Sequence, residues 1–212
     1  MAYIIAEMAL SHMGRMDLAQ RMIHNAAGAG CDAIKFQVYK TDELIDKVRG
    51  PERYAEFKER ELSYHQFADL KKYCELCCVE FLATPHTVGA FKFLDELGVD
   101  KFKVGSGDRG EILELALKTK KKTFVSSGMR DDVGINELIF KSRGQNMTIL
   151  HGVTQYPVST ENANLGVLRK LNQFTSEFGY SDHYPGTYAS ELAVAMGASI
   201  IEKHIRLPES EG

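Results

Sequence analysis

The feature that most constrains the fold is a regular alternation of short apolar runs with amphipathic segments along the whole chain. The apolar runs are rich in β-branched and aromatic residues, which favours strands, and eight of them occur: YIIAEM, AIKFQVY, EFLATPH, KFKVGSG, TFVSSGM, TILHGVTQYP, FGYSDH and SIIEKHI. Strand then helix, repeated with short connections, specifies parallel strands joined by right-handed crossovers. The sequence therefore predicts an α/β fold, a (β/α)8 TIM barrel, in a single domain over residues 1–212.

The segments between the runs carry helical periodicity, and several end on a glycine suited to a C-cap. They cover residues 17–30, 89–98, 111–120, 165–174 and 188–197. In the first of them we expect Asp17 to be the N-cap, with Leu18, Met22 and Ala26 on one face.

Two features depart from an even repeat. Residues 40–63 are longer than an ordinary connection and heavily charged, which suggests a folded excursion or a lid over one barrel mouth. After the last apolar run the chain stops at RLPESEG with no eighth helix. We therefore expect either a fragment or a partner that covers this flank of the barrel.

Composition narrows the class of function. With 26 basic and 29 acidic residues and a net charge of -3, the chain has no electrostatic footprint for nucleic acid or an anionic membrane. The N-terminus lacks the features of a signal peptide, and no run is long enough to span a membrane. The sequence thus favours a cytoplasmic protein that acts on small molecules.

The four cysteines do not indicate a disulfide framework, because three of them crowd into CELCC on an expected helix. Cys74 and Cys77 form a C-x-x-C pair that could indicate redox or zinc chemistry. They also recur at helical spacing with Phe67 and Leu70, which favours a buried stripe of an amphipathic helix.

Polar residues gather where the predicted strands end, which is where catalytic groups of such barrels collect. Many form i, i+2 pairs, which point to the same side of a strand. The set comprises Glu7, Lys35, Gln37, Thr84, Lys103, Ser106, Ser126, Ser127, His151, Thr154, Gln155, Ser181, His183, Glu202 and His204.

Lys35 and Lys103 are the most informative members, because each lies inside an apolar run. A buried ammonium group must be neutralised or lie opposite a permanent anion. With the surrounding hydroxyl groups, the two lysines suit a small phosphorylated carboxylate. The alternative is that the side chain of one lysine reaches solvent at the bottom of the barrel, or that it pairs with Glu7 or Glu202.

Two histidines near the ends of neighbouring strands, His183 and His204, could hold one divalent metal ion, with a carboxylate, water or substrate oxygen completing its shell. His12, His86 and His151 compete for this role. The GSGDRG segment at residues 105–110 matches a dinucleotide fingerprint, but the next strand ends in SSGM rather than an acidic residue. Its glycines better suit a tight turn over a phosphate.

Eight blocks in order and spacing resemble the sialic acid synthase family over essentially the entire chain: IIAEMALSHMG, AIKFQVYK, FLATPH, KFKVGSGD, FVSSGM, LHGVTQYP, GYSDH and GASIIEKH. The resemblance implies condensation of phosphoenolpyruvate with the open-chain aldehyde of N-acetylmannosamine or a related amino sugar. It also implies a divalent metal, manganese or magnesium, and release of phosphate.

The resemblance assigns roles residue by residue. Glu7 and Tyr156 would face the sugar, with Glu7 handling a proton, and Asp108 stands where the family usually has a glutamate near the reacting centre. His183 and His204 would bind the metal, and Gln37 is a further substrate-binding candidate. The phosphoenolpyruvate phosphate and carboxylate would be held by Lys35, Thr84, Lys103, Ser106, Ser126 and Ser181, with Thr154 at a position that helps with phosphate.

The chain also departs from the family pattern. Ser11 replaces an asparagine that is usual before His12. Thr154 replaces an asparagine or a serine, and His86 stands where an aromatic residue is common. The family's Pro-Gly-Pro-Asp segment and C-terminal antifreeze-like domain do not follow His204. Because that domain reaches into the partner subunit's site, the resemblance implies a homodimer and weak turnover by this chain alone.

Two other classes of function stay open. One is a barrel that binds a phosphorylated ligand without turnover, as a truncated or a regulatory subunit. The other is a Schiff-base aldolase that uses Lys35, Lys103 or Lys203, which borohydride trapping with a carbonyl substrate would reveal.

Overall fold

The computed structural model describes residues 1–108 and 110–209. Strands and helices alternate along the chain, and all eight predicted strands are present. In chain order the elements are β1 (Tyr3–Ala9), α1 (Met16–Gly28), β2 (Ala33–Val38), α2 (Thr41–Leu44), α3 (Pro51–Glu59), α4 (Tyr64–Leu76), β3 (Glu80–Pro85), α5 (Val88–Glu96), β4 (Lys101–Val104), α6 (Glu111–Lys118), β5 (Lys122–Ser126), α7 (Asp132–Ser142), β6 (Met147–His151), α8 (Gly166–Phe174), β7 (Phe178–Asp182), α9 (Tyr188–Ala195) and β8 (Ile200–His204).

The chain divides into two compact units. The N-terminal unit comprises Ala6–Val99 and Ile205–Gly212, and the C-terminal unit comprises Met1–Ile5 and Asp100–His204. Strand β1 contributes its first residues to the C-terminal unit and its remainder to the N-terminal unit. That both units fold as one domain, as the sequence suggests, stays a prediction.

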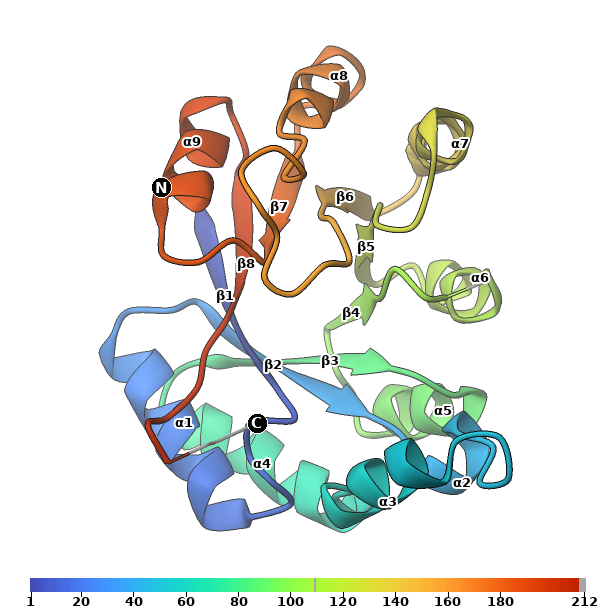
Figure 1. Ribbon diagram of the computed structural model, residues 1–212, viewed down its shortest axis with the longest axis vertical. Coiled ribbons are helices and arrows are strands. Elements are labelled where there is room, and N and C mark those ends of the chain that lie inside the picture. Colours follow the sequence, from blue (N-terminus) through green and yellow to red (C-terminus); the bar gives the residue numbers. More distant parts are fainter. Residues whose placement is uncertain (109, 210–212) are drawn as a thin grey trace. The chain divides into compact units, whose positions relative to one another are not determined.

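In the N-terminal unit the strand order is β3-β2-β1, and β2 and β3 run parallel with Lys35 opposite Leu82 and Gln37 opposite Thr84. Figure 1 shows α1, α4 and α5 along one side of these strands. The buried core contains Phe36, whose ring stacks on Phe81 at 4.8 Å and meets the edge of Phe67 at 6.2 Å. Large apolar side chains thus cover the strand face opposite the polar residues.

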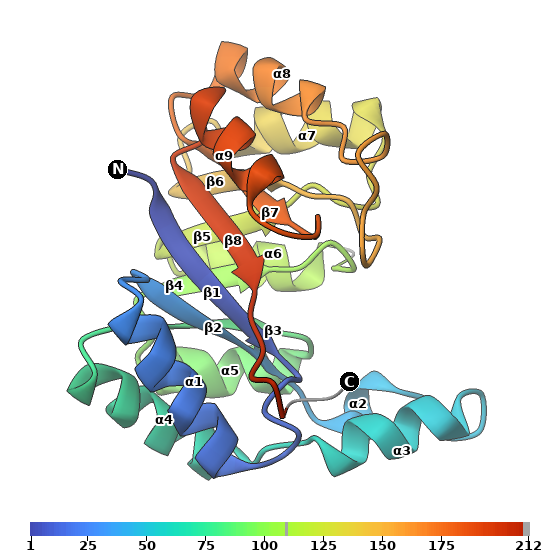
Figure 2. The ribbon, with the colours of Figure 1, turned by 60° about the vertical axis from the view of Figure 1, so that its left-hand side comes forward.

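The charged stretch at residues 40–63 is folded, as expected, and contains α2 and α3 (Figure 2). None of the nine residues of α3 is buried. The excursion is fastened at its ends, where Glu61 accepts hydrogen bonds from Lys40 Nζ at 3.0 Å and Thr41 N at 2.9 Å. It also approaches the turn after β1, because a Cβ on Gly14 (φ +71°) would lie 2.5 Å from the carbonyl oxygen of Glu59.

In the C-terminal unit the strand order is β1-β8-β7-β6-β5-β4, and the pairs from β4 to β8 are parallel. Helices α6 to α9 lie along one side of these strands (Figure 1). Phe102 and Phe178 are among the largest fully buried side chains. Among residues 205–209, which follow β8, no helix forms.

Two local expectations differ from the structure. Asp17 is not the N-cap of α1: the cap is Arg15, and Asp17 lies in the first turn, where it accepts a 2.6 Å hydrogen bond from the Arg15 guanidinium. The backbone N–H of Ala19 donates to the carbonyl oxygen of Arg15, three residues before the first buried residue, Leu18, so the helix starts two residues earlier than expected. Leu18, Met22 and Ala26 are buried as predicted.

The second difference is at the cysteine helix, where the expected buried stripe includes Cys74 but not Cys77. Phe67, Leu70 and Cys74 are buried on α4, whereas Cys77 is the half-buried C-cap of that helix. The four cysteines are free thiols. No helix in the described part of the chain has the length and apolar character needed to cross a membrane.

Candidate active site

The first polar cluster, which we call the Lys35 cluster, comprises Glu7, Lys35, Gln37 and Thr84 in the N-terminal unit. Lys35 is 4% exposed, and its Nζ lies 2.6 Å from Oε2 of Glu7, which is 1% exposed. The ammonium group also donates to Thr84 Oγ1 at 3.1 Å, and Gln37 Nε2 donates to Glu7 Oε1 at 3.3 Å. The cation therefore stays inside the protein because a carboxylate neutralises it.

Two of the competing histidines belong to the same unit. His12 is buried, and its Nδ1 accepts a hydrogen bond from Gly14 N at 3.1 Å. Burial and the positive charge of Arg60 lower the pKa of His12 to about 4, so the ring is neutral at pH 7 and stabilises the turn after β1. His86 is half-buried directly after β3.

The second cluster, the Lys103 cluster, comprises Lys103, Ser126, Ser181 and Glu202 on four strands of the C-terminal unit. Lys103 is 2% exposed, and its Nζ donates to Ser126 Oγ at 2.5 Å. The nearest oxygen of Glu202 is farther away, at 3.8 Å, and the other oxygen accepts from Ser181 Oγ at 2.8 Å. Lys103 is thus held by a hydroxyl group and more loosely by a carboxylate.

The hydroxyl groups of Ser106 and Thr154 converge on Gly128, just beyond the ends of β4, β5 and β6. A Cβ on Gly128 would collide with Ser106 Oγ and lie 2.8 Å from Thr154 Oγ1. Only glycine leaves room for this approach, so the backbone of the Ser127–Gly128 turn borders both hydroxyls. Backbone and hydroxyl groups of this kind suit a bound phosphate.

The sequence interpretation of the two histidines agrees with their geometry. The rings of His183 and His204 lie 5.3 Å apart between centroids, and the ring of Tyr156 lies 4.0 Å from that of His183 and 5.5 Å from that of His204. Tyr156, expected from the resemblance to face a sugar, therefore contacts the histidine pair. It is 62% exposed.

His183 is in the form that a metal ligand requires. Its Nδ1 lies 2.6 Å from the carbonyl oxygen of Val153, and a carbonyl only accepts, so Nδ1 carries the proton and Nε2 keeps its lone pair. Burial lowers the pKa of His183. The hydrogen bond to Val153 acts to raise this pKa, but burial outweighs it, and nearby His204 lowers the pKa further. The ring is therefore neutral at pH 7.

The histidine pair fits a metal ion only as part of a shell. Among the described residues, no group of three or more histidine, cysteine, aspartate or glutamate side chains could hold a metal ion. The neutral His183 and the neighbouring His204 suit a borderline divalent cation, with water or substrate oxygens as the other ligands. The metal stays a prediction.

Two other predicted residues have local partners. Asp108 accepts hydrogen bonds from the backbone N–H groups of Gly110, Ile112 and Leu113 at 3.0–3.2 Å, so its carboxylate caps the start of α6. His151 is buried; its Nε2 lies 3.1 Å from the carbonyl oxygen of Ala163 and its Nδ1 lies 3.3 Å from Ser127 Oγ. Both ring nitrogens of His151 are thus engaged, which leaves His183 and His204 as the histidine pair of this unit.

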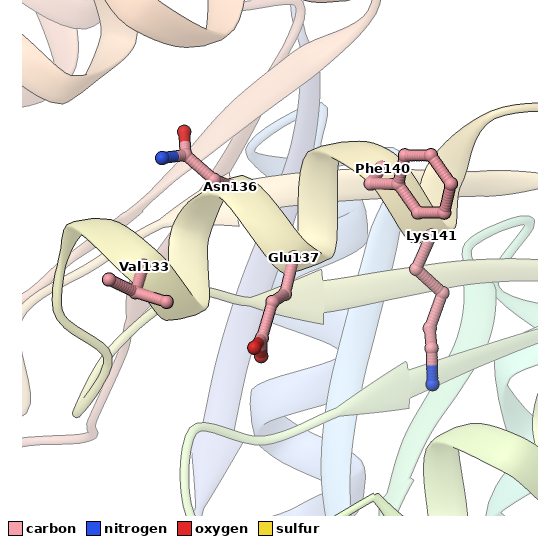
Figure 3. A pocket seen from close by; sticks show the side chains of 5 residues that line it. All are labelled: Val133, Asn136, Glu137, Phe140 and Lys141. Carbon is pink, nitrogen blue, oxygen red and sulfur yellow. The ribbon is translucent and has the colours of Figure 1, made fainter.

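A surface hollow lies away from these groups, along α7. Figure 3 shows its lining side chains, Val133, Asn136, Glu137, Phe140 and Lys141, which all come from this one helix. Val133 and Phe140 are 64% and 73% exposed. The hollow contains none of the predicted site residues, so it is a feature of the helix surface rather than a candidate active site.

Comparison with known proteins agrees with the predicted relationship. The sequence profile of the NeuB family matches residues 22–212. The chain belongs to the NeuB family. An uncharacterized protein of Methanocaldococcus jannaschii is 37% identical to it over 98% of this chain and 63% of that protein. An N,N'-diacetyllegionaminic acid synthase of Campylobacter jejuni is 34% identical over 98% of this chain and 68% of the enzyme.

A solved structure shows the fold class of this NeuB-family chain. The N-acetylneuraminic acid synthetase of Leptospira borgpetersenii, crystallised with citrate, is 35% identical and superposes with a TM-score of 0.86 over 97% of this chain and 73% of that one. The predicted (β/α)8 barrel class is confirmed. The chain spans somewhat less than two thirds of the length of the M. jannaschii relative, 63%.

Sequence reasoning missed some features of the clusters. It named Glu202 among the polar residues at the strand ends and as a possible partner for a lysine, but gave it no role in the site, although Glu202 lies in an apolar run as Lys35 and Lys103 lie in theirs. It did not single out Gly128, whose only signal was its place after two serines at a strand end. The reaction roles of all the predicted residues stay predictions.

Proposed function

We propose that this NeuB-family chain carries the site for condensing phosphoenolpyruvate with an amino-sugar aldehyde, giving a nonulosonic acid of the sialic type and phosphate. The supporting observation is the Lys103 cluster beside the histidine pair, in a chain 34% identical to a legionaminic acid synthase. A buried cation among hydroxyl groups suits a small anionic acid, and two neighbouring imidazoles suit a divalent cation.

In the proposed reaction the enol carbon of phosphoenolpyruvate forms a bond to the aldehyde carbon, whose oxygen takes up a proton. Water adds to the cationic carbon left behind and loses one proton; the bond from that carbon to the phosphate oxygen then breaks as the new hydroxyl group passes its remaining proton to the departing phosphate and becomes the keto group. The products are a 2-keto acid and phosphate. A divalent ion, manganese or magnesium, would supply Lewis-acid polarisation of the aldehyde oxygen.

The residues of the C-terminal unit have separate tasks in this proposal. Lys103 and Ser126 bind the anionic acid, whose charge then interacts with a fixed ammonium group in a site that excludes water. Ser106 and Thr154, on either side of Gly128, orient the phosphate oxygens. Ser181 holds Glu202 in place, and His183 and His204 present their imidazoles to the metal.

The Lys35 cluster is proposed to take part in the same reaction. Glu7 would move a proton at a sugar hydroxyl or at the attacking water, with Lys35 and Gln37 holding its carboxylate in position. Lys35 and Thr84 stay candidates for phosphoenolpyruvate. Asp108 keeps its capping role, and a direct role in catalysis is proposed only from the family pattern.

The test is an assay of phosphate release against a panel of amino sugars, phosphorylated and not, with and without manganese. It should be run on this chain and on any longer form of it. Release that needs both phosphoenolpyruvate and one sugar supports the proposal. Metal-dependent binding of phosphoenolpyruvate without release from either form would favour a binding barrel, and borohydride trapping of a carbonyl substrate would favour an aldolase.

Two further expectations accompany this function. A homodimer is proposed from the family pattern, and light scattering of the purified chain measures it. A cytoplasmic location is proposed from membership of the NeuB family, and fractionation of the source cells tests it.

A further inference from the structure

Asp182 and Lys203 occupy matching places next to the histidine pair. Asp182 lies between Ser181 and His183, and Lys203 lies between Glu202 and His204. In the parallel β7–β8 ladder Ser181 is opposite Glu202 and Asp182 is opposite Lys203. Because side chains alternate along a strand, Asp182 and Lys203 lie on the face opposite that of Ser181 and Glu202.

On that opposite face the two residues are joined to each other and to the turn after β7. The Asp182 side chain is fully buried, and its Oδ2 accepts from Lys203 Nζ at 2.9 Å and from Ser190 Oγ of α9 at 2.5 Å. Its Oδ1 accepts from the backbone N–H of Tyr184 at 2.8 Å. Lys203 Nζ also donates to the carbonyl oxygen of Tyr184 at 2.7 Å.

These bonds enclose His183. Asp182 and Tyr184 are its two chain neighbours, and both are tied to Lys203, the neighbour of His204. The direction in which the backbone leaves β7 therefore depends on the ion pair, as does its register with β8. Since the Asp182 carboxylate is buried, the ammonium group and the other donors that surround it compensate its loss of contact with water.

We propose that Asp182 and Lys203 are positioning residues, which fix the spacing and orientation of the His183 and His204 rings without touching a ligand. The inference deepens the proposed function and rests on it for the identity of the metal. It accounts for why the SDH and EKH segments match in register. The outer residues of both segments face the site, and the middle residues, Asp182 and Lys203, form an ion pair on the opposite face of the two strands.

The test uses two measurements on the same purified variants, Asp182→Asn, Lys203→Met and Ser190→Ala. The first is long-range ¹H–¹⁵N NMR of the histidine rings in the metal-free chain, which reports the His183 tautomer directly. The second is the Mn²⁺ dissociation constant from the electron paramagnetic resonance signal of the free ion. Wild-type His183 should show the Nδ1–H form expected from its bond to Val153.

Asp182→Asn and Lys203→Met should each mix the His183 tautomers and weaken Mn²⁺ binding by roughly 10- to 100-fold, as the loss of outer partners of metal ligands commonly does. The double variant should be no worse than either single variant, because both remove one unit. Ser190→Ala keeps the ion pair and should have a smaller effect. Lys203→Arg, which keeps the charge and can reach the same acceptors, should restore most of the affinity.

A matched control separates positioning from a loss of stability. Lys122→Met removes the ion pair between the first residue of β5 and Glu177, which directly precedes β7 in the same unit; the Lys122 side chain is 21% exposed, against 26% for Lys203. It should lower the melting temperature and leave both the His183 tautomer and the Mn²⁺ affinity unchanged.

The outcomes distinguish the two proposals. If Asp182→Asn lowers the melting temperature as Lys122→Met does, with the tautomer fixed and Mn²⁺ affinity within twofold of wild type, the positioning role is overturned. If the wild-type chain binds no Mn²⁺ but Asp182→Asn still mixes the tautomers, the positioning role is supported and the proposed metal chemistry is overturned.

Discussion

The Lys35 and Lys103 clusters use the same cation in different ways. Lys35 forms a direct ion pair with Glu7 at 2.6 Å, whereas Lys103 lies 3.8 Å from Glu202 and 2.5 Å from the Ser126 hydroxyl. In the Lys35 cluster the Glu7 carboxylate neutralises the ammonium group at close range. In the Lys103 cluster the Glu202 carboxylate is farther from the ammonium group and also accepts a hydrogen bond from Ser181. The difference suggests that Lys103 is the better receptor for an incoming anion and that Lys35 has the larger share in stabilising its unit.

The largest expected difference is in ligand binding. Lys103→Met should weaken phosphoenolpyruvate binding, and phosphate release if the chain turns over, by on the order of 10²–10³-fold, because it removes a fixed charge in a water-excluded site. Lys35→Met should weaken binding less. Isothermal titration of both variants with phosphoenolpyruvate makes the comparison, and an equal loss in the two would remove the distinction between the clusters.

A second difference should appear in stability. Lys35→Met leaves the Glu7 carboxylate buried without its ion-pair partner, which should lower the free energy of unfolding by about 3–5 kcal/mol. Lys103→Met should cost less, since Ser181 still donates to Glu202. Urea unfolding followed by circular dichroism measures both. Combining Lys35→Met with Glu7→Gln should recover part of the loss, and a double variant as unstable as Lys35→Met alone would argue against the pair as its source.

The hydroxyl groups give a smaller, matched comparison. Ser126→Ala removes the closest acceptor of Lys103, and Thr84→Ala removes the corresponding acceptor of Lys35. A hydrogen bond to a charged group contributes about 1.5–3 kcal/mol, so each variant should lose a comparable amount of stability. Only Ser126→Ala should also weaken phosphoenolpyruvate binding, by roughly tenfold. The control is Ser142→Ala, which removes a hydroxyl group that donates to the carbonyl oxygen of Ile139 in the preceding turn of its own helix.

The smallest expected effect is a pH dependence in the N-terminal unit. Burial acts to raise the pKa of Glu61, but hydrogen bonds from Thr41, Lys40 and Lys58 outweigh it and lower the pKa from 4.5 to about 2. Because the folded pKa is depressed, this contribution is present above pH 4.5 and is lost as the pH falls toward 2. Wild type should exceed Glu61→Gln in unfolding free energy by on the order of 1 kcal/mol at pH 6, and the gap should shrink by pH 3. A gap that is constant with pH would contradict this.

Much of the fold could be predicted because strand and helix signals are local. The runs AIKFQVY and SIIEKHI are strands through their β-branched and aromatic residues, and the burial of Lys35 and Lys103 follows from their place inside such runs. The start of α1 was placed two residues too late because the carbonyl of Arg15 already accepts the first helical hydrogen bond, from Ala19 N, which the spacing of apolar residues does not reveal.

The partners inside the site could not be predicted in the same way. Which carboxylate faces which lysine depends on the register of strands that are far apart in sequence, and Glu202 and Ser181 meet only through the β7–β8 ladder. The cap formed by Asp108 depends on the direction of α6. Histidine pairing was recoverable, because SDH and EKH repeat the same i, i+2 spacing at two strand ends.

The absence of buried side chains in α3 bears on how such a chain can diversify. A helix without a fully buried side chain can change much of its sequence with few compensating changes, provided that it keeps the contact of the Phe57 ring with the buried Tyr39, at 5.3 Å between centroids. Replacing the segment between Lys40 and Glu61 should therefore be the least disruptive way to change the surface of the N-terminal unit.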